Sequence, residues 1–148
     1  MNTKRPTMRR ALVAFAVAAG ATTIPAHPAF AAVNDSFWAY TTDGCGAIEF
    51  VDSGTYSDGT TNDDFFKVHD YCPDGHGVIA QADFIYLSGG SMDYTKYNGT
   101  GYNAPPVYWD PSNVKRGDEI FVTVCLVDGG SDTTWDKCGT HDHTSADG

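Results

Sequence analysis

Basic residues are scarce in this chain: nine lysines and arginines stand against 19 aspartates and glutamates, for a formal net charge of −10. Proteins that bind phosphate backbones or anionic membrane surfaces need clusters of Lys and Arg. The sequence therefore argues against nucleic acid and membrane as partners. The acidic surface is expected to serve solubility, with binding of calcium or of a basic protein as the alternative.

Signals for helices are scarce beyond the first thirty residues. Leucine occurs three times in the whole chain, whereas 16 glycines, many in D-G, G-G and N-G pairs, separate short runs of Val, Ile, Thr, Tyr and Phe. Such runs between turn signals are typical of strands. Seven or eight short strands over this length predict an all-β, immunoglobulin-like β-sandwich. We expect the strands at 36–42, 46–52, 65–72, 77–86, 93–97, 106–109, 118–127 and 134–140.

Motifs for catalysis and metal binding are missing as well. The sequence contains no G-x-S-x-G, no C-x-x-C and no calcium loop of the EF-hand type. The acid-rich segments 57–64 (SDGTTNDD) and 128–136 (DGGSDTTWD) are expected to be turns, with calcium binding as the alternative. With only Glu49 and Glu119 beside many aspartates, no acid pair stands out for glycoside hydrolysis. We expect a protein that is not an enzyme and has no cofactor or metal.

The N-terminal segment has the form of a signal peptide. A basic leader (MNTKRPTMRR) precedes an apolar run, and the run ends in the small-x-small triplet Ala29-Phe30-Ala31. We expect residues 1–31 to be removed and residues 32–148 to form one secreted, extracellular domain. The remaining part keeps five basic residues against 19 acids, a formal charge of −14.

Four cysteines lie in the part expected to be exported, which favours two disulfides over thiol chemistry. The midpoint of Cys45 and Cys72 falls in a D-G pair, and that of Cys125 and Cys138 falls within DGGSDT. Cysteines placed symmetrically about a turn can face each other across antiparallel strands. We therefore predict the pairs Cys45–Cys72 and Cys125–Cys138.

The register implied by the first pair raises a difficulty. Mirror pairing about residues 58–59 would place Glu49, rather than Ile48 or Phe50, beside Val68 on the inner face. A bulge, or a disulfide between sheets, would remove the conflict.

The stretch HDYCPDGHG (69–77) gathers histidines, aspartates and a cysteine as a metal site would. We interpret it as the turn of a hairpin between 65–72 and 77–86, because P-D-G is a turn sequence. Side chains alternate along a strand, so His69 and Asp70 would point to opposite faces and could not join one zinc site. His141-x-His143 is a better two-ligand fragment, but we place it in a polar tail, residues 141–148.

Aromatic residues are the strongest candidates for binding. Tyr and Trp on loops and edge strands commonly anchor proteins and sugars. Covering the core is the alternative role for both Trp38 and Trp109. The predicted partner-binding residues are Phe37, Trp38, Tyr40, Tyr97, Tyr102 and Trp109.

Several segments, covering about half of the exported part, resemble a group of small secreted actinobacterial proteins: WAYTTDGCGAIEFVD (38–52), DDFFKVHDYCPDGHGV (63–78), VYWDP (107–111), VCLVDGG (124–130) and the closing C…TSADG (138–148). More specifically, the chain resembles the small adaptor subunits of umbrella toxin particles, which are secreted antibacterial assemblies. The resemblance implies non-catalytic bridging in interbacterial competition, with one surface for a lectin subunit and another for a repeat-containing toxin subunit. It also implies an N-terminal arm, although only residues 32–36 precede FWAY.

Two functions of other classes remain open. One is an extracellular module that binds carbohydrate or calcium, which the loop aromatics and acidic loops would serve. The other is a secreted inhibitor of a hydrolase, which the size and cysteine number suit. No protruding reactive-loop motif is found between the cysteines to favour the inhibitor.

Overall fold

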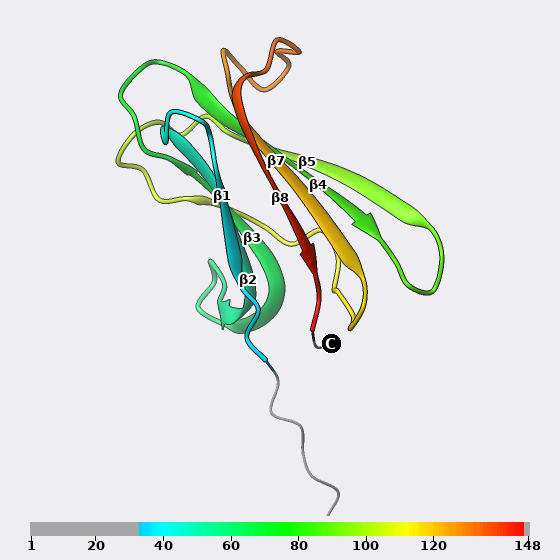
Figure 1. Ribbon diagram of the computed structural model, residues 1–148. Coiled ribbons are helices and arrows are strands. Elements are labelled where there is room, and N and C mark those ends of the chain that lie inside the picture. The colour runs from blue at the N-terminus through cyan, green and yellow to red at the C-terminus, as the bar shows by residue number, and fades with distance from the viewer. Residues whose placement is uncertain (1–32, 147–148) are drawn as a thin grey trace, which may run out of the picture. The chain divides into compact units, whose positions relative to one another are not determined.

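The computed structural model describes residues 33–146, so the expected signal peptide, residues 1–31, lies outside the described residues. The described part forms eight strands in two antiparallel sheets (Figure 1). It contains no helix with the length and apolar character needed to cross a membrane. The strands are β1 (Phe37–Tyr40), β2 (Gly46–Thr55), β3 (Thr61–Asp70), β4 (Gly77–Ile85), β5 (Ser91–Asn98), β6 (Val107–Trp109), β7 (Glu119–Val127) and β8 (Asp136–Thr144).

The sheets have the strand orders β1-β2-β3-β6 and β5-β4-β7-β8. They pack face to face around one apolar core, which confirms the all-β sandwich expected from the sequence. Each predicted strand is present, with ends that differ by a few residues. The inward positions alternate with outward ones, as the pleat requires. The largest fully buried side chains of the core include Phe50, Phe66, Phe84, Ile48 and Ile120.

The hairpin expected between 65–72 and 77–86 is wrong. β3 pairs with β2 and β6, whereas β4 pairs with β5 and β7 in the other sheet. Segment 71–76 is therefore a crossover between layers rather than a hairpin turn. The inward residues of both strands do belong to one core, and alternation alone cannot distinguish strands that face each other from strands that lie side by side.

The two predicted disulfides are confirmed, Cys45–Cys72 and Cys125–Cys138. The register difficulty disappears because the β2–β3 ladder centres on Asp58, so Ile48 lies opposite Val68 without a bulge or a bridge between sheets. Cys45 and Cys72 lie just beyond the ladder, where the Tyr71 amide donates to the Cys45 carbonyl at 2.8 Å.

The polar tail expected at 141–148 is wrong in its first part, because residues 141–144 belong to β8. Both histidines there pack on Phe37, with ring centroids 4.7 Å (His141) and 4.8 Å (His143) from it. His143 Nε2 also lies 3.0 Å from Asp35 Oδ2, which accepts the Ala146 amide at 2.7 Å. These contacts join the two ends of the described chain.

Candidate binding surfaces

Four rings lie together on the outer face of the first sheet: Trp38, Tyr40, His69 and Tyr71. Trp38 lies 5.8 Å from Tyr40 and 5.0 Å from His69, and His69 lies 5.4 Å from Tyr71, measured between ring centroids. Tyr40 and Tyr71 are 51 % and 40 % exposed. We call these four residues the aromatic face.

The register of three strands explains the aromatic face. Tyr40 of β1 and His69 of β3 both pair with Ala47 of β2, which lies between them. Ala47 is fully buried although it points outward. A methyl group at this position leaves room above β2, so rings from the two flanking strands can meet there.

A polar group borders the aromatic face. Glu49 Oε2 lies 3.2 Å from both Lys67 Nζ and His69 Nε2. Burial lowers the pKa of His69, and the hydrogen bond to Glu49 only partly opposes this effect. Burial likewise raises the pKa of the Tyr71 hydroxyl. At neutral pH the face therefore presents a neutral imidazole, with its proton on the nitrogen that meets Glu49.

Two of the predicted partner-binding residues lie inside the molecule. Phe37 and Trp109 are each 8 % exposed and belong to the core, where Trp109 packs on Phe66 with centroids 5.2 Å apart. Trp109 therefore covers the core, which is the alternative role given for it above. Trp38 is half-buried within the aromatic face.

The free side of β1 meets β8. The Thr42 amide donates to the Lys137 carbonyl at 2.8 Å. At Gly139 the two backbones come so close that a Cβ atom would overlap the carbonyl oxygen of Tyr40. This edge of the first sheet is thus partly covered, and the outer face rather than the edge is what β1 offers to a partner.

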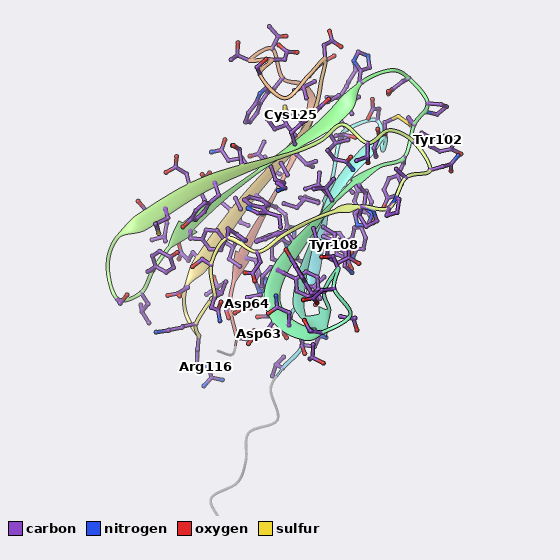
Figure 2. The ribbon with its side chains drawn as sticks, turned by 180° about the vertical axis from the view of Figure 1, so that it is seen from behind. Asp63, Asp64, Tyr102, Tyr108, Arg116 and Cys125 are labelled. Carbon is purple, nitrogen blue, oxygen red and sulfur yellow. A yellow bond between two sulfur atoms is a disulfide. The ribbon has the colours of Figure 1, made fainter. Side chains whose placement is uncertain are left out.

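Tyr97 and Tyr102 lie at the other candidate region, the end of the sandwich where β3 and β5 end (Tyr102, Figure 2). Tyr97 is half-buried against three glycines, Gly77, Gly99 and Gly130, at each of which a Cβ would crowd its ring. Tyr102 is 48 % exposed. The Tyr97 ring therefore has a packing role in addition to any contact with a partner. The Tyr102 ring is open to solvent.

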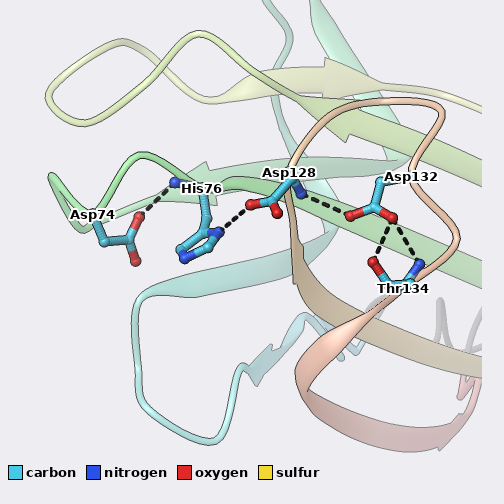
Figure 3. Close-up of polar contacts among 5 residues, drawn as sticks. All are labelled: Asp74, His76, Asp128, Asp132 and Thr134. Carbon is cyan, nitrogen blue, oxygen red and sulfur yellow. Dashed lines mark hydrogen bonds and ion pairs between the residues drawn. The ribbon is translucent and has the colours of Figure 1, made fainter.

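Two aspartates of the acid-rich segments, Asp58 and Asp132, accept hydrogen bonds within their own turns. His76 Nδ1 lies 2.7 Å from Asp128 Oδ1, and the Asp128 amide donates to Asp132 at 3.0 Å. Figure 3 shows how these contacts follow one another. Asp132 also accepts from the Thr134 hydroxyl and amide, and these bonds lower its pKa to about 2. The turn expected at 57–64 is shorter than predicted, because residues 61–64 belong to β3; within it, Asp58 accepts from Thr60 in the same way.

Within the described residues, one group of three side chains has the spacing of metal ligands: Cys45, Cys72 and Asp74. Its two sulfur atoms are joined in a disulfide, so they are not available as thiolate ligands. The group therefore does not support a metal site.

A hollow of about 360 Å³ lies beside Tyr97 and Tyr102, and its wall includes Asp70, Gly75 and His76. We call it the Asp70 pocket. Asp70 is 9 % exposed; its Oδ1 accepts the Cys72 amide at 3.2 Å, and its Oδ2 has no hydrogen-bond partner among the described residues. Burial, with a smaller contribution from Asp74, raises the pKa of Asp70.

Replacing Asp70 with asparagine is expected to stabilise the fold at neutral pH by about 1 kcal/mol, because the buried carboxylate then carries no charge. A raised pKa means that the folded state holds the proton more tightly, so wild-type stability is lost as pH rises through the folded pKa. Below pH 3.8, the ordinary value, both proteins are neutral at this position and the difference should vanish. Urea unfolding of D70N and wild type at neutral and acidic pH measures this difference in stability. Equal stability of the two proteins at neutral pH would contradict the prediction.

Comparison with known proteins adds no relative. No protein-family model matches the chain, and searches of curated proteins and of solved structures find no match either.

Proposed function

We propose that this protein is a secreted, non-catalytic protein-binding module, and that it acts as an adaptor between two subunits of an extracellular antibacterial complex. The observation that carries the binding role is the aromatic face. Clustered Tyr and Trp side chains that are partly exposed on a rigid sheet are typical centres of protein interfaces.

The disulfides support the extracellular part of the proposal, because such bonds persist in oxidising compartments. The adaptor role rests on the resemblance to umbrella toxin adaptors, which bridge a lectin subunit and a repeat-containing toxin subunit. An adaptor needs two separate surfaces. The aromatic face on the first sheet and the loop region around Tyr102 supply two candidates.

The double variant Tyr40→Ala, Tyr71→Ala is expected to lose partner binding by tenfold or more, since truncation of an interface aromatic commonly costs about 2 kcal/mol or more. Both side chains are exposed, so the variant should fold normally. The measurement immobilises the purified protein, passes proteins secreted by the source organism over it, and quantifies each retained protein by mass spectrometry.

Leu87→Ala is the matched control, because Leu87 is 76 % exposed and follows β4 of the other sheet. It should retain the same companion as wild type. If wild type retains no companion, or if the double variant retains it equally well, the aromatic face is not the docking surface.

Carbohydrate binding is a second candidate that one observation favours. The Trp38 and Tyr40 rings are stacked, 11° from parallel, and Tyr40 is 51 % exposed, so an aromatic ring is open to a sugar beside Trp38. A glycan array probed with wild type and with Tyr40→Ala distinguishes the two functions: a glycan signal that this substitution abolishes would favour the carbohydrate module.

A further inference from the structure

Asp70, in the wall of the Asp70 pocket, has a buried acceptor oxygen that lacks a donor. Asp70 Oδ2 is closed to solvent and receives no hydrogen bond from the described residues. Leaving a buried polar atom unsatisfied costs about 1–3 kcal/mol. Folding does not require a carboxylate here, because the oxygen of an asparagine could accept the Cys72 amide equally well.

We propose that the Asp70 pocket binds the cationic end of an arginine or lysine side chain that a partner protein inserts. An N–H of the cation donates to Asp70 Oδ2, and the stem of the side chain lies against Tyr97 and Tyr102. The inference deepens the proposed function and rests on it for the existence of a partner protein. The pocket is nevertheless a separate site from the aromatic face.

Three features of the pocket suit a cation. Asp74 lies just outside the wall, with a carboxylate oxygen within 4.8 Å of the sulfur of Cys72, a wall residue, and adds a second negative charge near Asp70. The two tyrosine rings can attract a cation through their faces. His76, the basic group in the wall, is paired with Asp128 at 2.7 Å, so its charge when protonated is compensated.

A side chain of the wall has to move before a donor can reach Asp70 Oδ2, because that atom is buried. Of the two tyrosines in the wall, Tyr102 has more freedom to move, since it is 48 % exposed whereas Tyr97 is half-buried. Tyr102 also lies between two residues in the left-handed conformation, Gly101 and Asn103, in the loop between β5 and β6. Binding should therefore change the environment of the Tyr102 amide along with that of Asp70.

A titration with N-acetyl-arginine amide, followed by NMR of the ¹⁵N-labelled protein with both disulfides intact, tests the proposal. We expect saturable shifts at the amides of 70–72, 74–77 and 97–102. Asp70→Asn should weaken binding about tenfold, the effect of losing one charge-assisted hydrogen bond, and Tyr102→Leu should weaken it less. N-acetyl-citrulline amide, which has the same shape without the charge, should produce no shifts at these amides.

Asp63→Asn is the matched control, because it removes one charge from the same strand at the end remote from Tyr102 (Figure 2). It should bind the arginine derivative as wild type does. Equal binding by D70N, shifts spread over the whole acidic surface, or no shifts at the named amides would each overturn the proposal. Because the ligand is a small molecule, this result is independent of whether Tyr40 and Tyr71 bind a partner protein.

Discussion

Gly139→Ala is expected to lower the free energy of unfolding by about 3 kcal/mol, the upper part of the range for forcing extra atoms into a packed site. An added Cβ would overlap the carbonyl oxygen of Tyr40, and the obstacle is backbone rather than the end of a flexible side chain. β1 and β8 would have to separate, and this would break the hydrogen bond from the Thr42 amide to the Lys137 carbonyl. Thermal unfolding should show a melting temperature lower by about 10 °C.

Gly129→Ala provides the control for this prediction. Gly129 lies in the loop between β7 and β8, and a Cβ there would meet no atom within 4 Å. Its backbone does not adopt the left-handed conformation, so alanine should be tolerated with little change in stability. Equal melting temperatures for both variants would mean that β1 and β8 do not approach each other as closely as the structure shows.

Removing the Cys45–Cys72 disulfide by the double substitution to alanine is expected to cost about 3.5 kcal/mol, from the entropy of the unfolded loop that it closes. The bond joins residues 27 apart, whereas Cys125–Cys138 joins residues 13 apart, so loop entropy alone makes the first bond worth about 0.6 kcal/mol more. Urea unfolding of the variant against wild type measures the loss.

Side-chain packing has the opposite effect on the relative cost of removing the two disulfides. Cys125 is fully buried beside Ile79 and Val127, whereas Cys72 lies at the start of the crossover. Alanine at position 125 therefore loses apolar contacts in addition to the bond. Chemical reduction of wild type, which removes the bonds but keeps the sulfur atoms, separates the two contributions. A loss below 1 kcal/mol for the Cys45→Ala, Cys72→Ala variant would show that the end of the ladder holds without its disulfide.

The strands and disulfides could be predicted because both depend on local information. Alternation marks which residues face inward, and the cysteines lie symmetrically about turn sequences. The partner of β4 could not be predicted in this way, because β3 and β7 show the same inward pattern and differ only in which layer they occupy. The crossover at 71–76 carries a turn sequence that fits either arrangement.

The binding surfaces could be predicted only in part. Trp38 and Tyr40 stand out in the sequence, but the contribution of His69 and Tyr71 depends on the register across β2 and on the small side chain of Ala47. Asp70 could not be recognised at all. The pocket it lines is completed by the loop around Tyr102, about thirty residues further along the chain, and sequence patterns carry no information about that contact.

The contact of Asp35 with Ala146 brings the two ends of the described chain together. They meet at the end of the sandwich where Glu119 pairs with Thr144, whereas Gly46 pairs with Asp70 and Gly77 with Val127 at the opposite end. A fusion or an affinity tag joined directly to residue 33 or 146 would therefore start far from the Asp70 pocket. A short peptide linking the ends would also yield a circular permutant, with new termini opened in an exposed loop and the order of strands within each sheet unchanged.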